Sequence, residues 1–167
     1  MSQDLKTELV ALLPRLRRFA RTMTRSVTEA DDLLQEACVR ALSRADQRDP
    51  TRPLDRWMYR IIRNLWISEM RKRTVRQGQG GVPAEDAVEL STTDTGETQL
   101  AARQLGRTIS TLPKDLSSIL LLVSVEGHSY SEAAEILNIP VGTVMSRMYR
   151  ARNALADRMA AQGDARP

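Results

Sequence analysis

The most informative part of this 167-residue chain is SYSEAAEILNIPVGTVMSRMYRAR, residues 129–152. Ser129 followed by Glu132 fits a capping box, in which each side chain hydrogen-bonds the backbone of the other residue at the start of a helix. Asn138 then marks a break, because asparagine tolerates the left-handed backbone that a tight turn requires. A second helix follows, rich in small residues and arginines. The segment therefore predicts a helix–turn–helix.

The second helix of this segment has an outward face that suits a DNA groove. Small residues at its start permit close approach, and its N-terminal amides can meet phosphates. Its hydroxyls and arginines can bond phosphates or base edges. A tight helical hairpin with solvated arginines is the alternative, but the spacing, turn chemistry and charge together favour DNA binding. The predicted DNA-binding residues are Val141, Gly142, Thr143, Ser146, Arg147 and Arg150.

The composition favours a helical protein with an anionic partner. Hydrophobic residues make up 41% of the chain and aromatic residues only 4%, so its cores are largely aliphatic. The formal net charge is +4, carried mainly by arginine, although a basic protein without an anionic partner is the alternative. No apolar run approaches ~20 residues, and the N-terminus has no signal-peptide pattern. We therefore expect a cytoplasmic protein without membrane insertion.

Helical spacing of apolar residues also begins near the N-terminus. Such residues recur from Leu5 to Met23, and Pro14 is expected to kink that helix or to start it afresh. Thr28, with an acid three positions later, is the predicted cap of a second helix that runs through about Ser43. Residues 45–53 are polar and contain two prolines, which indicates a loop.

The second predicted helix opens with the acidic run DDLLQE, residues 31–36. Acids in a first turn compensate the helix macrodipole without needing any partner. Leu34 and Gln35 beside these acids could equally form a protein-docking face. Spacing alone leaves both interpretations open.

A third helix is predicted from residue 54 to residue 73, with the clearest amphipathic pattern in the chain. Its other face is basic, and aromatic residues interleave with the arginines, an arrangement that suits unstacked bases as well as phosphates. A solvated charged face is the alternative, since Trp57 falls on the apolar stripe and can equally be a core residue. That stripe consists of Leu54, Trp57, Met58, Ile61, Ile62 and Leu65.

Helical periodicity disappears from Thr74 to about Thr98, where glycine, proline and acidic residues gather. We interpret this stretch as a flexible acidic linker rather than a mobile loop within one domain, because each side has its own helical apolar pattern. Beyond it, one helix is predicted around Leu105, and another from Pro113 to a stop at Gly127. The expected architecture is all-α, with small helical domains at 1–74 and 99–160, a linker at 75–98 and a disordered tail at 161–167.

Catalysis has little support in the sequence. His128 is the only histidine and follows a helix stop, so it is interpreted as a loop residue. The lone Cys38 excludes an intramolecular disulfide framework and is interpreted as a packing residue. The chain has no metal-ligand cluster, no glycine-rich phosphate loop between a strand and a helix, and no nucleophile with a base. We therefore expect no cofactor, no metal and no enzymatic activity.

Three segments resemble, in order, the signature segments of the extracytoplasmic-function (group IV) sigma factors. They are DDLLQEACVRAL at 31–42, WMYRIIRN at 57–64 and GTVMSRMYRAR at 142–152. One segment alone would be weak support, whereas three in the right order and at the right distances are strong. The family often has glycine at the position of Asn138, a difference that left-handed geometry tolerates.

This resemblance implies specific roles for residues of the first domain. The acidic helix would bind the clamp coiled coil of the largest polymerase subunit through Asp31, Asp32, Leu34, Gln35 and Glu36, with Arg40 contributing. The loop at 45–53 and the basic helix would read and hold open the minus-ten promoter element. The residues implied there are Asp49, Arg52, Arg56, Trp57, Arg60, Arg63, Asn64, Arg71, Lys72 and Arg73.

For the chain as a whole, the resemblance implies an alternative sigma factor for stress-type promoters. The helix–turn–helix would read the minus-thirty-five element as duplex DNA. The expected partners are core RNA polymerase, through its clamp coiled coil and flap, promoter DNA, and an anti-sigma factor. The rival hypothesis is an autonomous helix–turn–helix regulator that binds duplex operators without polymerase.

Overall fold

The computed structural model describes residues 2–77 and 97–164. All regular structure in these residues is helical, and the chain divides into two compact units, Met1–Asp86 and Ala87–Pro167. The predicted all-α, two-domain architecture is therefore confirmed. Most of the predicted linker, residues 78–96, lies outside the described residues, as do residues 165–167 of the predicted tail. None of the helices in the described ranges combines the length and the apolar character needed to cross a bilayer.

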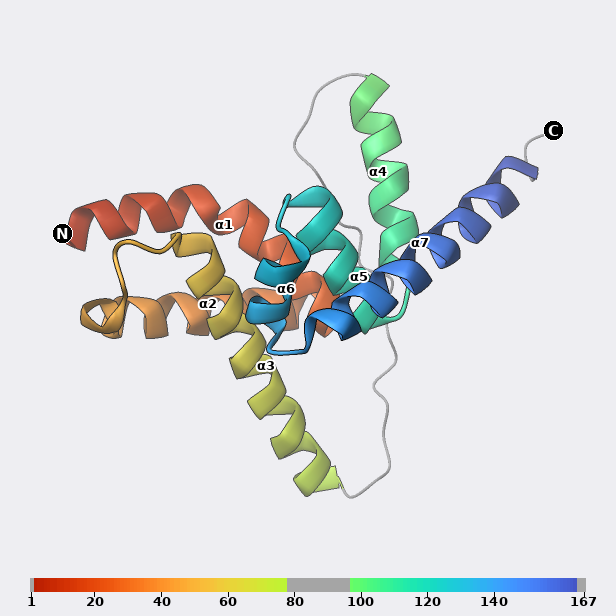
Figure 1. Cartoon of the computed structure of the whole chain (residues 1–167). Helices are drawn as coiled ribbons and strands as arrows, with labels where there is room; N and C mark the ends of the chain where they lie inside the picture. The colour runs from red at the N-terminus through yellow and green to blue at the C-terminus, as the bar shows by residue number, and fades with distance from the viewer. Residues whose placement is uncertain (1, 78–96, 165–167) are drawn as a thin grey trace. The chain divides into compact units, whose positions relative to one another are not determined.

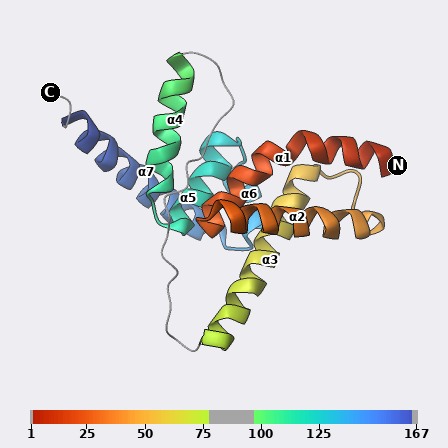
Figure 2. The ribbon, with the colours of Figure 1, turned by 180° about the vertical axis from the view of Figure 1, so that it is seen from behind.

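The first unit is a bundle of three helices, α1 (Ser2–Thr24), α2 (Val27–Ser43) and α3 (Leu54–Gln77). Each helix packs against the other two, and α3 crosses α1 and α2 (Figures 1 and 2). A short 3-10 helix, η1 (Ala45–Gln47), begins the connection from α2 to α3. Phe19 of α1 and Tyr59 of α3 are both fully buried, with their ring centroids 5.0 Å apart in an edge-to-face contact.

The start of α2 differs from the sequence-based expectation. The cap is Ser26, whose side chain accepts a hydrogen bond from the Glu29 backbone amide, so the predicted cap at Thr28 is wrong. Pro14 lies inside the single continuous helix α1, so it does not start the helix afresh. The cap differs because Ser26 and Thr28 both have the chemistry of a helix cap, whereas α1 accommodates Pro14 in its interior.

The buried face of α3 is wider than the predicted stripe. Leu54, Met58, Ile62 and Leu65 are buried as expected, whereas Trp57 and Ile61 are half-buried. Tyr59 and Trp66 are buried although they lie off the stripe. Because α3 packs against two helices rather than one, it covers apolar side chains over a broader arc than a single stripe.

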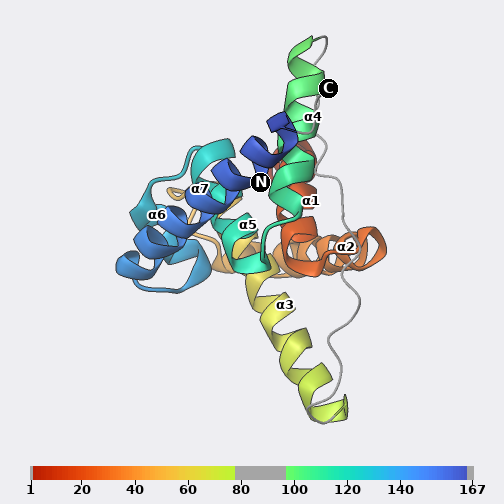
Figure 3. The same ribbon diagram turned by 90° about the vertical axis from the view of Figure 1, so that its right-hand side faces the viewer.

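The second unit contains α4 (Glu97–Ser110), α5 (Lys114–Leu120), α6 (Tyr130–Leu137) and α7 (Val141–Asp164). A π-helical turn, η2 (Leu121–Val125), follows α5 directly. The predicted stop at Gly127 is present as a left-handed backbone with φ of 76°. Buried aliphatic residues from α5, η2, α6 and α7 form one core, as Figure 3 shows for the arrangement of these helices. Its fully buried members include Ile119, Leu121, Leu122, Ile136, Val144 and Met148.

Three helices extend beyond the predicted domain boundaries. Helix α4 begins at Glu97, two residues before the expected start of the second domain at residue 99. Helix α3 continues to Gln77, past the expected end of the first domain at residue 74. Helix α7 continues to Asp164, so part of the segment predicted as a disordered tail is helical. An established helix gains one hydrogen bond for each residue added, so it can continue through polar residues that carry no apolar pattern.

Candidate nucleic-acid and protein interfaces

The helix–turn–helix predicted at residues 129–152 is present as α6 and α7. The Glu132 amide donates to Ser129 Oγ at 3.0 Å, and the Ser129 amide donates to Glu132 Oε2 at 3.2 Å, which completes the capping box. Asn138 has φ of 53° and ψ of 51°, the left-handed geometry expected at the break. The local structure of the motif is therefore confirmed.

The exposed face of α7 overlaps the predicted DNA-binding residues without coinciding with them. Val141, Gly142, Ser146 and Arg150 are exposed. Thr143 and Arg147 are half-buried, and Arg147 Nε lies 4.0 Å from Asp115 Oδ2 of α5. Two exposed residues on this part of α7 were missed: Met145 is 55% exposed and Tyr149 is 70% exposed. Their helical spacing relative to the buried Val144 and Met148 could have identified them.

We expect Ser129→Ala to destabilise the second unit by about 1 kcal/mol, because the helix loses the hydroxyl acceptor of its cap. Amide hydrogen exchange of α6 in the full chain measures this loss. Ser131→Ala is the matched control, since Ser131 is exposed in the first turn of the same helix and should change stability by less than ~0.5 kcal/mol. Equal effects of the two substitutions would contradict a capping role for Ser129.

The basic face of α3 presents several of the predicted cations to solvent. Arg60, Asn64, Arg71 and Lys72 are exposed, whereas Arg56 and Arg63 are half-buried. Arg63 Nη1 donates to Asn64 Oδ1 at 3.3 Å. Burial, and secondly the charge of Arg71, lower the pKa of Arg63. This concentration of like charge on one side of a helix is the electrostatic arrangement that binds phosphates.

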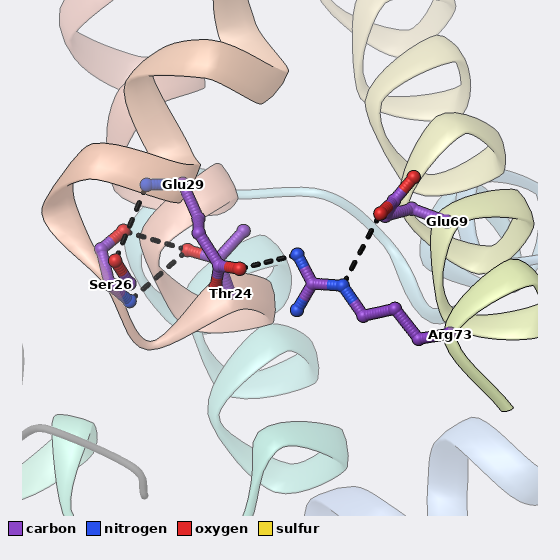
Figure 4. A network of polar contacts seen from close by, with 5 residues as sticks. All are labelled: Thr24, Ser26, Glu29, Glu69 and Arg73. Carbon is purple, nitrogen blue, oxygen red and sulfur yellow. Dashed lines mark hydrogen bonds and ion pairs between the residues drawn. The ribbon is translucent and has the colours of Figure 1, made fainter. Parts of the chain in front are cut away.

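Arg73, a predicted DNA contact, has polar and aromatic partners within the first unit. Its Nη2 donates to Glu29 Oε1 of α2, its Nε donates to Glu69 Oε1 at 3.3 Å, and its guanidinium lies 5.3 Å from the centroid of the Trp66 ring. Figure 4 shows the side chain of Arg73 between Glu29 and Glu69. Burial acts to lower the pKa of Arg73, but the hydrogen bonds and charges of Glu29 and Glu69 outweigh it and raise the pKa.

The DNA contact expected of Arg73 stays a prediction. Within the unit, its guanidinium is engaged by two carboxylates and an aromatic ring, which offset its charge and use two of its N–H donors. Figure 4 places the network next to the start of α2, where Ser26 caps the helix and Thr24 Oγ1 donates to the Ser26 carbonyl at 3.0 Å. Arg73 therefore links the end of α3 to the beginning of α2.

The loop before α3 contains two predicted promoter-contacting residues, Asp49 and Arg52. Asp49 Oδ1 accepts hydrogen bonds from the Thr51 amide at 2.9 Å and from Thr51 Oγ1 at 2.6 Å. These bonds, with smaller contributions from the charges of Arg52 and Arg48, lower the pKa of Asp49. The Arg52 side chain is 66% exposed. The loop thus has internal order and a cation exposed at its surface.

The acidic part of α2 forms a solvent-facing stripe. Asp31, Asp32, Gln35 and Glu36 are exposed, as predicted for a docking face. Asp31 Oδ1 lies 3.2 Å from Arg17 Nε, and Arg40 Nη2 lies 3.8 Å from Glu36 Oε1. Leu34 differs from these residues, because it is only 4% exposed and packs in the core, so its predicted contact with polymerase stays a prediction.

Val39 completes the exposed stripe of α2 in place of Leu34. It is 63% exposed and follows Asp32, Gln35 and Glu36 at the spacing of neighbours on one helix face. A polar groove of about 420 Å³ separates this region from α3 and is lined by Asp32, Glu36 and Arg40 on one side and by Trp66 and Lys72 on the other. Residues predicted to bind protein and residues predicted to bind DNA therefore line one groove.

The single histidine of the chain, His128, is buried, and its single cysteine, Cys38, is half-buried. His128 is 7% exposed, and its Nδ1 lies 3.3 Å from Glu132 Oε2, the carboxylate of the capping box. Burial raises the pKa of the half-buried Cys38 thiol, which disfavours the reactive thiolate. Within residues 2–77 and 97–164, no three His, Cys, Asp or Glu side chains are grouped so that they could hold a metal ion.

Comparison with protein families gives two matches, in the order of the two units. Sigma-70 region 2 matches residues 9–76, and Sigma-70, region 4 matches residues 102–155. The first match falls on α1 to α3, and the second spans most of α4 to α7.

Individual proteins are also similar to this chain in sequence and structure. The ECF RNA polymerase sigma factor EcfG of Rhodopseudomonas palustris is 34% identical, over 93% of this chain and 85% of its own length. The ECF RNA polymerase sigma factor SigW of Bacillus subtilis is 36% identical, over 80% and 76%. A solved structure, that of the sigma factor RpoE in complex with the anti-sigma factor NepR from Bartonella quintana, is similar with a TM-score of 0.78 and 31% identity, covering 95% of this chain and 98% of the other.

Proposed function

This chain belongs to the extracytoplasmic-function (ECF) group of sigma-70 factors, and on that basis we propose how its two units divide promoter recognition. Sigma factors bind core RNA polymerase and promoter DNA, and they act in transcription initiation. The observation that carries the proposal is the pairing of an acidic, partly apolar face on α2 with the basic α3 in one unit, followed by a helix–turn–helix in the other.

In the first unit, the exposed stripe of α2 is the surface for core polymerase. Asp32, Gln35, Glu36 and Val39 place acidic and amide groups next to an exposed apolar side chain, a face that can pair with a cationic surface of a partner. The basic side of α3 is the surface for the minus-ten element, with Arg60, Asn64, Arg71 and Lys72 exposed along it. The 45–53 loop next to α3 is the part that contacts unpaired bases.

In the second unit, α7 reads the minus-thirty-five element as duplex. Gly142 and Ser146 allow close approach, and Arg150 supplies a charge-assisted donor to phosphate or to guanine. Met145 and Tyr149 add apolar surface on the same helix, suited to thymine methyl groups. The unit supplies positioning and sequence contacts, while the polymerase carries out the chemistry.

We further propose that an anti-sigma factor controls this protein and that it acts in the cytoplasm, on stress or envelope-response promoters. The similarity to a sigma factor solved with the anti-sigma factor NepR supports such a partner. An anti-sigma factor would act by covering the surface of α2 or the exposed face of α7.

Transcription with purified core RNA polymerase tests the proposed function. We expect the full chain to give promoter-specific initiation that core polymerase alone does not give, and to bind isolated promoter duplex weakly. Tight binding to duplex without polymerase, together with no promoter-specific transcripts, would instead support an autonomous helix–turn–helix regulator.

The contribution of α7 gives a second expected result. Arg150→Ala should lower initiation at a promoter that depends on its minus-thirty-five element by about tenfold, the loss of one good base or phosphate contact, and leave core polymerase affinity unchanged. Arg152→Ala is the control, because residue 152 lies on a different side of the helix from residue 150. If both variants initiate as well as the wild type, Arg150 is not a promoter contact.

A further inference from the structure

The loop that connects α2 to α3 is ordered by hydrogen bonds within its own backbone. The Gln47 amide donates to the Arg44 carbonyl at 2.9 Å, and the Arg52 amide donates to the Asp49 carbonyl at 3.2 Å. Pro50 occupies the second position of the turn from Asp49 to Arg52, where its fixed φ favours that geometry. The loop lies beside the first half of α1 in Figures 1 and 2.

Arg48 is the side chain that attaches this loop to α1. Its Nη2 donates to the Arg52 carbonyl at 3.5 Å and lies 3.8 Å from Glu8 Oε2. Only 16% of the Arg48 side chain is exposed, compared with 66% for Arg52 in the same loop. One guanidinium therefore spans the turn and contacts a carboxylate of the N-terminal helix.

The low exposure of Arg48 separates its role from that of Arg52. A guanidinium that gives up its water needs acceptors or opposite charge in exchange. Arg48 Nη2 has a backbone carbonyl as its acceptor and the Glu8 carboxylate as its ion-pair partner, whereas the buried Arg48 Nε has no hydrogen-bond partner among the described residues. An arginine covered in this way cannot serve as a surface cation for DNA phosphates. Its contacts instead restrict where the turn from Asp49 to Arg52 lies relative to α1.

We propose that Arg48 is a positioning residue for base recognition, which holds the 45–53 loop in its reading position through Glu8 of α1. This inference rests on the proposed function, in which the loop contacts unpaired bases of the minus-ten element. A pocket for an extruded base discriminates by polar groups held at fixed places, and a loop that is already ordered loses less entropy when the base binds. The N-terminal helix thereby takes part in promoter specificity without touching DNA.

Base discrimination by the reconstituted holoenzyme tests this role. With promoters randomised over the minus-ten element, we expect Arg48→Ala to reduce the strongest single-base preference about fivefold, a part of the cost of one mismatched position. Arg48→Lys should restore part of the preference, because the amine can still reach Glu8. Glu8→Gln should share the loss, and adding it to Arg48→Ala should cost little more, as for two residues that act through one contact.

The salt dependence of promoter binding separates positioning from direct contact. Arg48→Ala should leave the slope of log affinity against log salt unchanged, whereas loss of a phosphate contact at Arg52 should reduce it by about one. A reduced slope for Arg48→Ala, or unchanged base preference in this variant, would overturn the inference. Unchanged preference in Glu8→Gln would overturn the involvement of α1.

Hydrogen exchange in the free chain tests whether Arg48 holds the loop, independently of the proposed function. The Arg52 amide should be protected in the wild type and should exchange faster in Arg48→Ala and Glu8→Gln, while the core amides of α3 keep their protection. This result does not depend on polymerase. If the wild-type chain failed to direct transcription, the proposed function would fall, and exchange at Arg52 would still decide whether Arg48 holds the loop.

Discussion

Val39→Asp is expected to weaken binding to core RNA polymerase by roughly thirtyfold, about 2 kcal/mol, without unfolding the first unit. Val39 is 63% exposed, so the free protein accommodates a charge there at little cost. In the complex, a new carboxylate at the apolar position of the α2 stripe would lose its water without gaining a partner. Titration of labelled core polymerase with the variant measures the loss.

Val10→Asp is the matched control for Val39→Asp. Val10 is also a helical valine of the first unit and is 65% exposed, but it lies on α1. The same substitution there should leave polymerase affinity within about threefold of the wild type, since surface changes away from an interface are close to neutral. Equal losses in the two variants would mean that α2 is not the docking helix.

Leu34 gives the complementary result within the same helix. It is 4% exposed, so Leu34→Ala should create a cavity and destabilise the first unit by about 3 kcal/mol. Fluorescence follows this unit alone, because both tryptophans, Trp57 and Trp66, lie in α3. The fraction of the Leu34→Ala protein that remains folded should bind polymerase with near-normal affinity, because Leu34 is a core residue.

The features that sequence predicted well are those governed by neighbouring residues. The capping box of Ser129 and Glu132 and the left-handed Asn138 each depend on a few adjacent positions, and each is present. The division into helical units also follows from local periodicity. Even so, the cap of α2 was placed at Thr28 instead of Ser26, because both residues have a hydroxyl and are followed by an acid.

The features that sequence did not predict depend on residues distant along the chain. Leu34 belongs to the core because α2 packs against both α1 and α3, which no spacing within residues 31–36 reveals. Arg73 follows Arg71 and Lys72 in an unbroken basic run, yet only Arg73 reaches Glu29, which precedes it by 44 residues. A charge pattern therefore locates the basic surface of α3, but not which cations are available to DNA.

Arg73→Ala should accordingly lower the stability of the first unit, whereas Arg71→Ala should weaken DNA binding. Loss of Arg73 removes its bonds to Glu29 and Glu69 and its contact with Trp66, and we expect the first unit to lose about 1–2 kcal/mol of stability. Loss of the exposed Arg71 should change stability by less than ~0.5 kcal/mol. Urea unfolding followed by tryptophan fluorescence measures both values.

The salt dependence of promoter binding by the holoenzyme measures the effect of the same two substitutions on DNA contact. Arg71→Ala should reduce the slope by about one, as expected for a lost phosphate contact, and Arg73→Ala should leave it unchanged. Glu29→Gln should reproduce the stability loss of Arg73→Ala, and the double variant should be less destabilised than the sum of the two. A reduced salt slope together with unchanged stability for Arg73→Ala would instead assign Arg73 to DNA. Arg73 would then have to exchange its two carboxylates for phosphate when the promoter binds, which would release the end of α3 from the start of α2.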